Sequence, residues 1–422
     1  PDKKWIDGSG WAYGIVPAGS FPSRKALDAV VPDRPVVLSS YDGHSTWVNT
    51  RALVLAGVTA KTKDPAGGKI VREEDGTPQG TLLEDAGGLV LKKVPAADRD
   101  AQSAALRRAA QELAALGVTS IDDIEHDAVV LELLHDLEKK GELPVRVRLG
   151  LPLEGDLEHY QTLRKKYGSD MLRFGFLKGF VDGVIESKTA YLLEPYVGSE
   201  ERGEPRIPPE RLKTLVARAH ADGLPVVFHA IGDAAVRISL DAFEADALAK
   251  RTVHHEPDRI EHIELLALDD APRFAKLGVL ASMQPIHATP EPGEAVWSTN
   301  LGEERLRRTF PWRALLNAGA TLQFGSDAPV ASPDVLHGLA VAVTRRNREG
   351  WPPEGWNAHQ AITIEQALAA YTNGRRIEVG APADLAILSA EVDLTRPATL
   401  WEGSVTATLL GGRITHGASS LR

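Results

Sequence analysis

The sequence predicts an α/β fold, a (β/α)8 TIM barrel with a small β-sandwich domain, from three observations. In residues 96–374, short apolar or β-branched runs alternate with helical stretches, which is typical of βαβ units around a parallel sheet. Several helical stretches end in a glycine just before the next run, at Gly117, Gly223, Gly278 and Gly319, where a left-handed residue closes a helix. The length of 422 residues suits a barrel of about 250 residues with insertions and a small second domain.

Seven strands can be assigned in this repeat. They are expected within GVTSIDD (117–123), VRVRLGLPL (145–153), LRFGFLKGFVDG (172–183), LPVVFHAIGD (224–233), DRIEHIEL (258–265), GVLASMQPIH (278–287) and TLQFGSDAPV (321–330). Helices are expected at 100–116, 128–140, 157–167 and 209–222. A closed barrel needs eight strands, so one strand is missing from this count.

Two regions lie outside the repeat. Residues 1–95 are rich in Gly, Pro, Asp and Trp and are expected to form an insertion, or lid, of the barrel. Residues 96–374 are expected to form the barrel itself. In residues 375–422 short strands alternate with glycine turns, which indicates part of a small β-sandwich domain.

Composition excludes several classes of function. The net charge of −10 argues against a nucleic-acid partner, which favours a basic face. The absence of cysteine excludes disulfides, thiolate chemistry and a Cys-ligated zinc. No apolar run reaches the roughly 20 residues that span a bilayer, so no membrane partner is expected. The cytoplasm is the expected compartment.

Polar residues end four of the predicted strands. They are Lys178, His229, His262 and Asp327, and in a parallel barrel the catalytic groups project from the carboxyl ends of the strands. Each has a bland alternative, since a histidine at a strand end is more often structural and an aspartate can cap a loop. Lys178 is harder to interpret as structural, because a lysine between phenylalanines on a barrel strand is poorly solvated. One reason for a lysine there is reaction with carbon dioxide, because a carboxylated lysine can bridge two cations. Two imidazoles and two oxygen donors suit Zn²⁺ or a similar divalent ion.

The chain resembles a known family in motifs spread over nearly its whole length. These are WIDGSGW, LDAVVPDRPVVLSSYDGHSTWVNTRAL, LKGFVDGVIESKTA, VVFHAIGDAAV, RIEHIELL, MQPIHATPE and FGSDAPVASPD. They resemble the amidohydrolase superfamily, in the branch of the N-substituted formamide deformylases. The resemblance implies that Lys178, His229, His262 and Asp327 bind one or two divalent metal ions, with Zn²⁺ expected.

One element of the family pattern is missing. In the superfamily the first strand ends in a His-x-His pair of ligands, and this sequence contains no such pair. Since the chain begins with Pro1 and not Met, we expect a longer protein in which an upstream segment supplies the first strand and the pair. Residues 1–95 then follow that strand, and the metal site of this chain alone is expected to be depleted.

The resemblance also implies a mechanism. A metal-activated water attacks the carbonyl, and Asp327 serves first as base and then as acid. We expect a hydrolase of C–N bonds other than peptide bonds, acting on a small amide, N-acyl or N-formyl compound with an apolar substituent, because Trp and Tyr residues occur in the insertion and strand-end loops. His44, Trp47 and His287 are expected to bind substrate, with simple packing as the alternative for Trp47.

Some assignments stay open at this stage. Asp182 either orients a ligand or caps a turn, and the remaining histidines, including His126, His220 and His255, are interpreted as structural or exposed. The alternative functions are an ester, lactone or phosphoester hydrolase that uses the same site, and a non-catalytic binding or regulatory protein that retains the barrel. Assembly into a homodimer is also left open.

Overall fold

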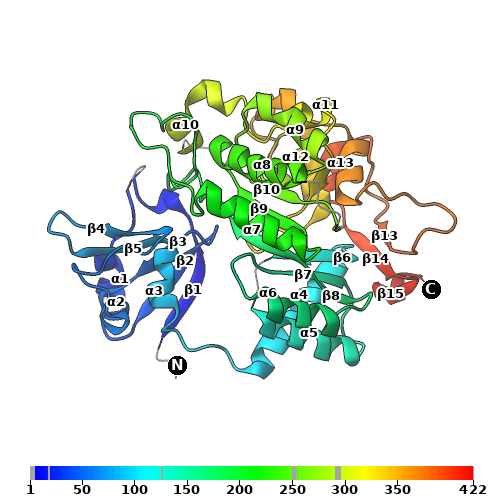
Figure 1. The fold of residues 1–422 in the computed structure, drawn as a ribbon. Coiled ribbons are helices and arrows are strands. Elements are labelled where there is room, and N and C mark those ends of the chain that lie inside the picture. Colours follow the sequence, from blue (N-terminus) through cyan, green and yellow to red (C-terminus); the bar gives the residue numbers. More distant parts are fainter. Residues whose placement is uncertain are drawn as a thin grey trace. The chain divides into compact units, whose positions relative to one another are not determined.

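The computed structural model describes residues 5–17, 20–124, 127–249, 253, 255–289 and 296–421. His126 therefore lies outside the described residues. The chain forms two compact units, each built from three chain segments (Figure 1). The first unit contains Pro1–Ala97, Val181–Pro208 and Gly293–Glu304; the second contains Asp98–Phe180, Pro209–Pro292 and Arg305–Arg422.

The first unit contains a five-stranded sheet in the order β1-β2-β3-β5-β4. Its first two strands are parallel and its other neighbours antiparallel. Its strands are β1 (Ile6–Trp11), β2 (Val36–Ser40), β3 (Ser45–Val48), β4 (Gly68–Arg72) and β5 (Pro78–Glu84), and its helices include α1 (Arg24–Val30), α2 (Thr50–Ala56) and α3 (Gly88–Leu91). One apolar core, including Val37, Val48, Ile70 and Leu82, holds sheet and helices together.

A single buried side chain joins the start of α2 to the sheet. Asn49 is the N-cap of α2 and is fully buried. Its Oδ1 accepts from the backbone N–H of Ala52 and of Val36, each at 3.0 Å. Its Nδ2 donates to two backbone carbonyls, those of Val31 and Arg34. The side-chain amide thus provides hydrogen-bond partners both for the start of α2 and for the first residue of β2, which an apolar side chain cannot do.

The second unit is built on a parallel sheet, and all seven strands predicted from the sequence are confirmed. Within the described residues the order is β12-β11-β10-β9-β8-β7-β6. The strands are β6 (Ser120–Asp123), β7 (Arg146–Pro152), β8 (Leu172–Phe180), β9 (Val226–Ala230), β10 (Arg259–His262), β11 (Leu280–Met283) and β12 (Leu322–Phe324). The four glycines expected to close helices all have positive φ, from 67° to 82°.

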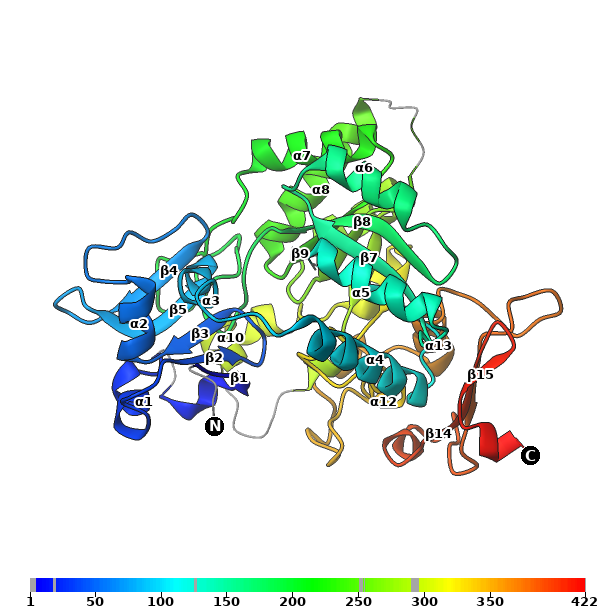
Figure 2. The ribbon, with the colours of Figure 1, turned by 90° about the horizontal axis from the view of Figure 1, so that it is seen from below.

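Helices cover this sheet. They are α4 (Arg99–Ala115), α5 (Ala128–Lys139), α6 (Leu157–Lys166), α7 (Pro209–Ala221), α8 (Asp233–Leu248), α9 (Ala271–Leu277), α11 (Trp312–Asn317), α12 (Val335–Thr344) and α13 (Ile364–Tyr371). Another helix, α10 (Val296–Leu306), contains a break at Gly302. Helices α7 and α8 lie side by side along β9 (Figure 1), and α5 runs along β7 and β8 (Figure 2). None of the described helices is both long and apolar enough to cross a membrane.

The predicted eight-stranded barrel is shown only in part. The sheet has its edges at β6 and β12, and in the described part of the chain no strand pairs with both of them. What the structure shows is therefore an α/β fold with a seven-stranded parallel sheet. The expected β-domain near the C-terminus contributes one antiparallel sheet of β13 (Leu385–Leu388), β14 (Val405–Leu410) and β15 (Arg413–His416).

That small sheet packs on the second unit through α4. The hydroxyl of Thr408 in β14 donates to the backbone carbonyl of Ala114 at 2.6 Å. Gly117, just beyond α4, has φ 81°, and a Cβ there would lie 2.9 Å from the Cβ of Ala386 and 3.1 Å from Val405. The position therefore requires glycine twice, for its backbone conformation and for the close approach of the sheet.

Candidate metal centre

The register of the parallel sheet places two predicted site residues on one face. Phe180 of β8 pairs with His229 of β9, and His229 pairs with Glu261 of β10. Laterally paired residues in a sheet point to the same side, as do residues two apart in one strand. Lys178, two residues before Phe180, therefore shares this face. Lys178 and His229 are both buried, with exposures of 4% and 2%.

His262 reaches the same region by a departure from strand alternation. As the residue after Glu261, it would point away from the face that carries His229 if β10 continued regularly. Instead His262 and Ile263 have φ of 74° and 48°, a conformation that is rare outside glycine and costly for a β-branched residue. The ring centroid of His262 lies 4.5 Å from that of His229. The strained backbone at His262 thus occurs where its imidazole lies beside that of His229.

Three side chains from three strand ends come close enough to hold an ion. One ligand atom from each of His262, His287 and Asp327 lies within 4.8 Å of the others. Two ligands bound at about 2.1 Å can be at most about 4.2 Å apart, so the group needs only a small contraction to bind Zn²⁺. Asp327 also has positive φ, 58°. Backbone strain at two members of one group is typical of functional sites.

His287 lies beside two of the predicted metal ligands. The sequence predicts it as a substrate contact, and the structure brings it into the group with His262 and Asp327. It lies in the short helix η4 (Pro285–Ala288), just after β11. Its Nδ1 is 3.7 Å from Oε1 of Glu264, a buried carboxylate. A carboxylate beside a histidine is the usual means of orienting a metal ligand.

Lys178 lies against an aromatic ring. Its Nζ is 4.7 Å from the centroid of the Phe180 ring, and that ring is 5.1 Å from the ring of His229. Lys178 and His229 therefore both lie beside the Phe180 ring. A buried lysine is costly unless its charge is compensated or removed.

The buried side chain of Arg259 forms ion pairs that the sequence did not reveal. Arg259 of β10 is 6% exposed and pairs with Asp122 of β6, and with Glu261 at 2.8 Å between Nε and Oε1. Burial works to lower the pKa of Arg259, but the charges of Glu261 and Asp122 outweigh it and raise the pKa above its usual range. Gln284 donates to the other oxygen of Glu261 at 3.3 Å. These contacts hold β10 from both sides, just before His262.

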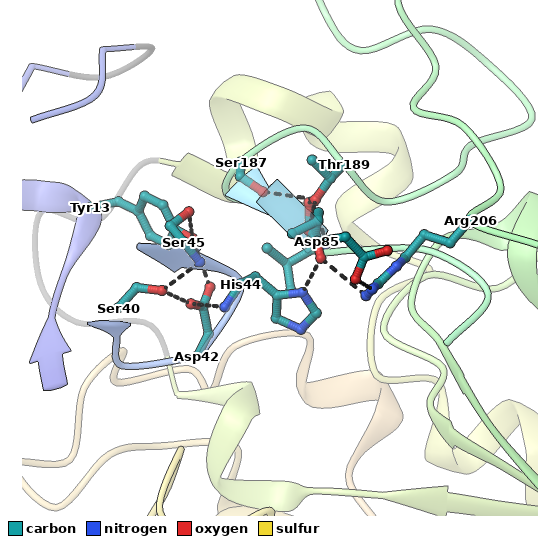
Figure 3. A network of polar contacts seen from close by, with 11 residues as sticks. Tyr13, Ser40, Asp42, His44, Ser45, Asp85, Ser187, Thr189 and Arg206 are labelled. Carbon is teal, nitrogen blue, oxygen red and sulfur yellow. Dashed lines mark hydrogen bonds and ion pairs between the residues drawn. The ribbon is translucent and has the colours of Figure 1, made fainter. Parts of the chain in front are cut away.

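The other two predicted substrate contacts, His44 and Trp47, belong to the first unit. Nδ1 of His44 donates to Oε2 of Glu84 at 2.8 Å. Figure 3 labels His44, Thr189 and Arg206 in this network of polar contacts. Burial works to lower the pKa of His44, but the charge and hydrogen bond of Glu84 outweigh it and raise the pKa to about 9. Glu84 also accepts from the hydroxyl of Thr189 at 2.7 Å and from Arg206 at 3.3 Å. His44 is therefore held as a cation in a fixed orientation.

Trp47 is packed within the first unit. Its Nε1 donates to the carbonyl of Ser23 at 3.1 Å, and its ring meets that of Trp11 edge to face at 6.4 Å. The packing alternative for this residue thus has direct contacts to support it. Asp182 is buried and accepts from the backbone N–H of Tyr191, nine residues further along the chain, at 2.9 Å. Both roles considered for Asp182 stay predictions.

Comparisons with known proteins come from sequence and from structure. The family whose sequence profile matches this chain, over residues 1–416, is the amidohydrolase family. The protein YtcJ of Bacillus subtilis (strain 168) is 29% identical over 434 residues, which cover 99% of this chain and 80% of that protein. N-substituted formamide deformylase of Arthrobacter pascens is 28% identical over 427 residues, covering 93% of this chain and 75% of the enzyme. An uncharacterized metal-dependent hydrolase of Pyrococcus horikoshii OT3 has a crystal structure that is 27% identical, with a TM-score of 0.67, over 88% of this chain and 72% of that one.

Proposed function

This chain belongs to the amidohydrolase family, and on that basis we propose that it is a metal-dependent hydrolase of C–N bonds other than peptide bonds. The substrate class is a small amide, an N-acyl or an N-formyl compound with an apolar substituent. The observation that carries the proposal is the group of His262, His287 and Asp327, whose ligand atoms lie within 4.8 Å of one another. The deformylase and the metal-dependent hydrolase among the similar proteins support the same chemistry.

The donor atoms of this group fit a divalent ion such as Zn²⁺. Imidazole nitrogen and carboxylate oxygen are its ordinary ligands in the absence of cysteine. We assign His229, His262, Asp327 and a carboxylated Lys178 as ligands, and His287 either as a further ligand or as a substrate contact. When bound, the ion supplies an electrophilic centre that lowers the pKa of a nearby water toward neutrality.

The proton transfers fall to Asp327. It is exposed, whereas His262 is buried and His287 is of intermediate exposure, so water and substrate have access to its carboxylate. Asp327 accepts a proton from the attacking water and later donates it to the leaving nitrogen, acting as base and then as acid. His44 and Trp47 remain proposed substrate contacts, and the fixed cation of His44 suits a carbonyl or anionic group of a substrate.

The test is turnover by Asp327→Asn on a matched panel of amides, esters and lactones. The substitution removes basicity with almost no change in volume, so turnover is expected to fall by about 10²–10⁴-fold while the circular dichroism spectrum stays unchanged. Asp269→Asn, at an exposed position of the same unit, is the control and should keep wild-type turnover. Full activity in Asp327→Asn would contradict the assigned role.

The panel also separates the alternatives. Preference for esters or lactones over matched amides contradicts the C–N bond assignment and leaves the hydrolase assignment standing. If the metal-loaded protein turns over no member of the panel yet binds several of them, the non-catalytic alternative holds.

A further inference from the structure

A second cluster of titratable side chains lies at the other end of the parallel sheet. His220 is on α7 and Asp246 is on α8. Asp258 directly precedes β10, and its Oδ1 accepts from the backbone N–H of Val226, the first residue of β9, at 2.8 Å. The cluster is therefore at the amino ends of β9 and β10, whereas His229 and His262 lie at their carboxyl ends.

His220 is held between two carboxylates. Its Nδ1 lies 2.7 Å from Oδ2 of Asp246, and its Nε2 lies 2.9 Å from Oδ1 of Asp258. All three side chains are buried, with exposures of 4%, 7% and 9%. Two carboxylates in a buried place require positive charge between them.

The imidazole of His255 completes the cluster, and one of its ring nitrogens already has a hydrogen-bond partner. The ring of His255 stacks on that of His220, with centroids 4.0 Å apart and an interplanar angle of 23°. Nδ1 of His255 lies 2.6 Å from the backbone carbonyl of Glu256. A carbonyl only accepts, so Nδ1 carries the hydrogen and Nε2 of a neutral ring carries the lone pair. A histidine whose Nδ1–H is bound to a carbonyl or carboxylate is arranged as metal ligands usually are.

We propose that His220, His255 and Asp258 form a second binding site for one divalent transition-metal ion, of the class of Zn²⁺. One ligand atom from each residue lies within 4.8 Å of the others. Asp246 accepts the Nδ1–H of His220, and the carbonyl of Glu256 accepts that of His255, so each imidazole presents Nε2 as a ligand. This is a set of two nitrogens and one oxygen with its orienting partners in place.

The ion has a competitor and a path of entry. The competitor is a proton on His220: burial works to lower the pKa of this residue, but Asp258 and Asp246 outweigh it and raise the pKa. Binding must therefore release that proton and strengthen as pH rises. The path is a surface pocket of about 450 Å³, lined in part by His255, Glu256, Arg173 and Pro225.

Metal stoichiometry tests the site without reference to hydrolysis. Chelated protein is dialysed against Zn²⁺, and bound metal is measured by mass spectrometry for the wild type, His255→Gln and His159→Gln. The control residue His159 is exposed on α6 of the same unit. We expect the control to bind as many ions as the wild type, and His255→Gln to bind one ion fewer.

Two more variants distinguish this site from the candidate metal centre. His262→Gln impairs the candidate metal centre and should leave the second ion in place. When Co²⁺ replaces Zn²⁺, the His262→Gln variant should therefore still show the absorption of bound Co²⁺, and the double variant His262→Gln/His255→Gln should lose it. Asp246→Asn removes a partner and not a ligand, so it should weaken binding at the second site by about 10–100-fold. Equal stoichiometry and affinity in His255→Gln and the control would overturn the proposal. It would show that the cluster is a protonated histidine bridging two aspartates.

Discussion

Replacing Glu84 by glutamine isolates the interaction that keeps His44 charged. Glutamine keeps the shape of the side chain and an oxygen that can accept from Thr189, while it removes the negative charge that faces His44 and Arg206. The residue also has φ of 50°, a conformation that only strong local contacts sustain in a non-glycine residue. The loss of charge should therefore be felt both in the pKa of His44 and in stability.

The structure gives the size of the effect. The pKa of His44 rises from 6.5 to about 9, which is 2.5 units, and at 1.36 kcal/mol per unit this amounts to about 3 kcal/mol. The side chains of His44 and Glu84 are 11% and 5% exposed, so solvent screening is modest. Because the pKa is raised in the folded state, this stabilisation is complete below about pH 6.5 and is lost as pH rises through about 9.

Two measurements check the prediction. Titration of the His44 ring followed by NMR should show its pKa falling by at least 2 units in Glu84→Gln, because the charge and hydrogen bond of Glu84 outweigh the effect of burial. Thermal unfolding should show the variant destabilised more at pH 6 than at pH 10. Glu138→Gln breaks the helix-surface pair with His135, whose side chains are 27% and 20% exposed, and should cost less than about 1 kcal/mol. An unchanged pKa of His44, or the same destabilisation at both pH values, would refute the reasoning.

Three further predictions concern the packing and the metal centre. Asn49→Ala leaves two buried N–H groups and two carbonyls without this partner, and should lower the free energy of unfolding by about 2–4 kcal/mol. The control, Ser23→Ala at the more exposed N-cap of α1, should lower it by about 1 kcal/mol. Denaturant unfolding measures both variants. Gly150→Ala places a Cβ 2.1 Å from the ring of Phe176 and should cost about 1–3 kcal/mol through overpacking, seen as a lower melting temperature. If Lys178 is carboxylated, metal-loaded protein supplied with ¹³C-bicarbonate should show a carbamate carbon that is absent from Lys178→Met and after chelation; a signal that survives in the variant rules this residue out.

The strands of the second unit could be predicted because local chemistry decides them. Apolar runs, helix periodicity and the glycines before each strand are all short-range features, and the predicted helix 157–167 differs from α6 (Leu157–Lys166) by one residue. Lys178 and His229 share a face because Lys178 pairs with Val227, two residues before His229, on a neighbouring strand. For these two residues, the position in the sequence is enough to predict the face of the sheet on which they lie.

The remaining features depend on contacts between distant segments, which no local pattern records. The approach of His262 to His229 needs a positive φ at a histidine, and nothing in the sequence RIEHIEL signals it. Glu84 finds its partners 105 and 122 residues away. Residues 181–208 and 293–304, which fall inside the predicted barrel range 96–374, are grouped by their contacts with the first unit. The pairing of His220 with Asp246 and Asp258 is likewise long-range, so the sequence alone indicates only a structural or exposed histidine at this position.

The composition of the first unit from three chain segments has a consequence for its synthesis. Its five-stranded sheet is complete once residue 84 has been made, but its last segment ends at Glu304, 207 residues after Ala97. At 5–20 residues per second, that interval lasts about 10–40 s. During it, the carboxylate of Glu84 must wait first for Thr189 and then for Arg206 to leave the ribosome. The nascent chain therefore holds a complete sheet in an incomplete unit while most of the parallel strands are still being translated, so the first unit begins to fold early and finishes late.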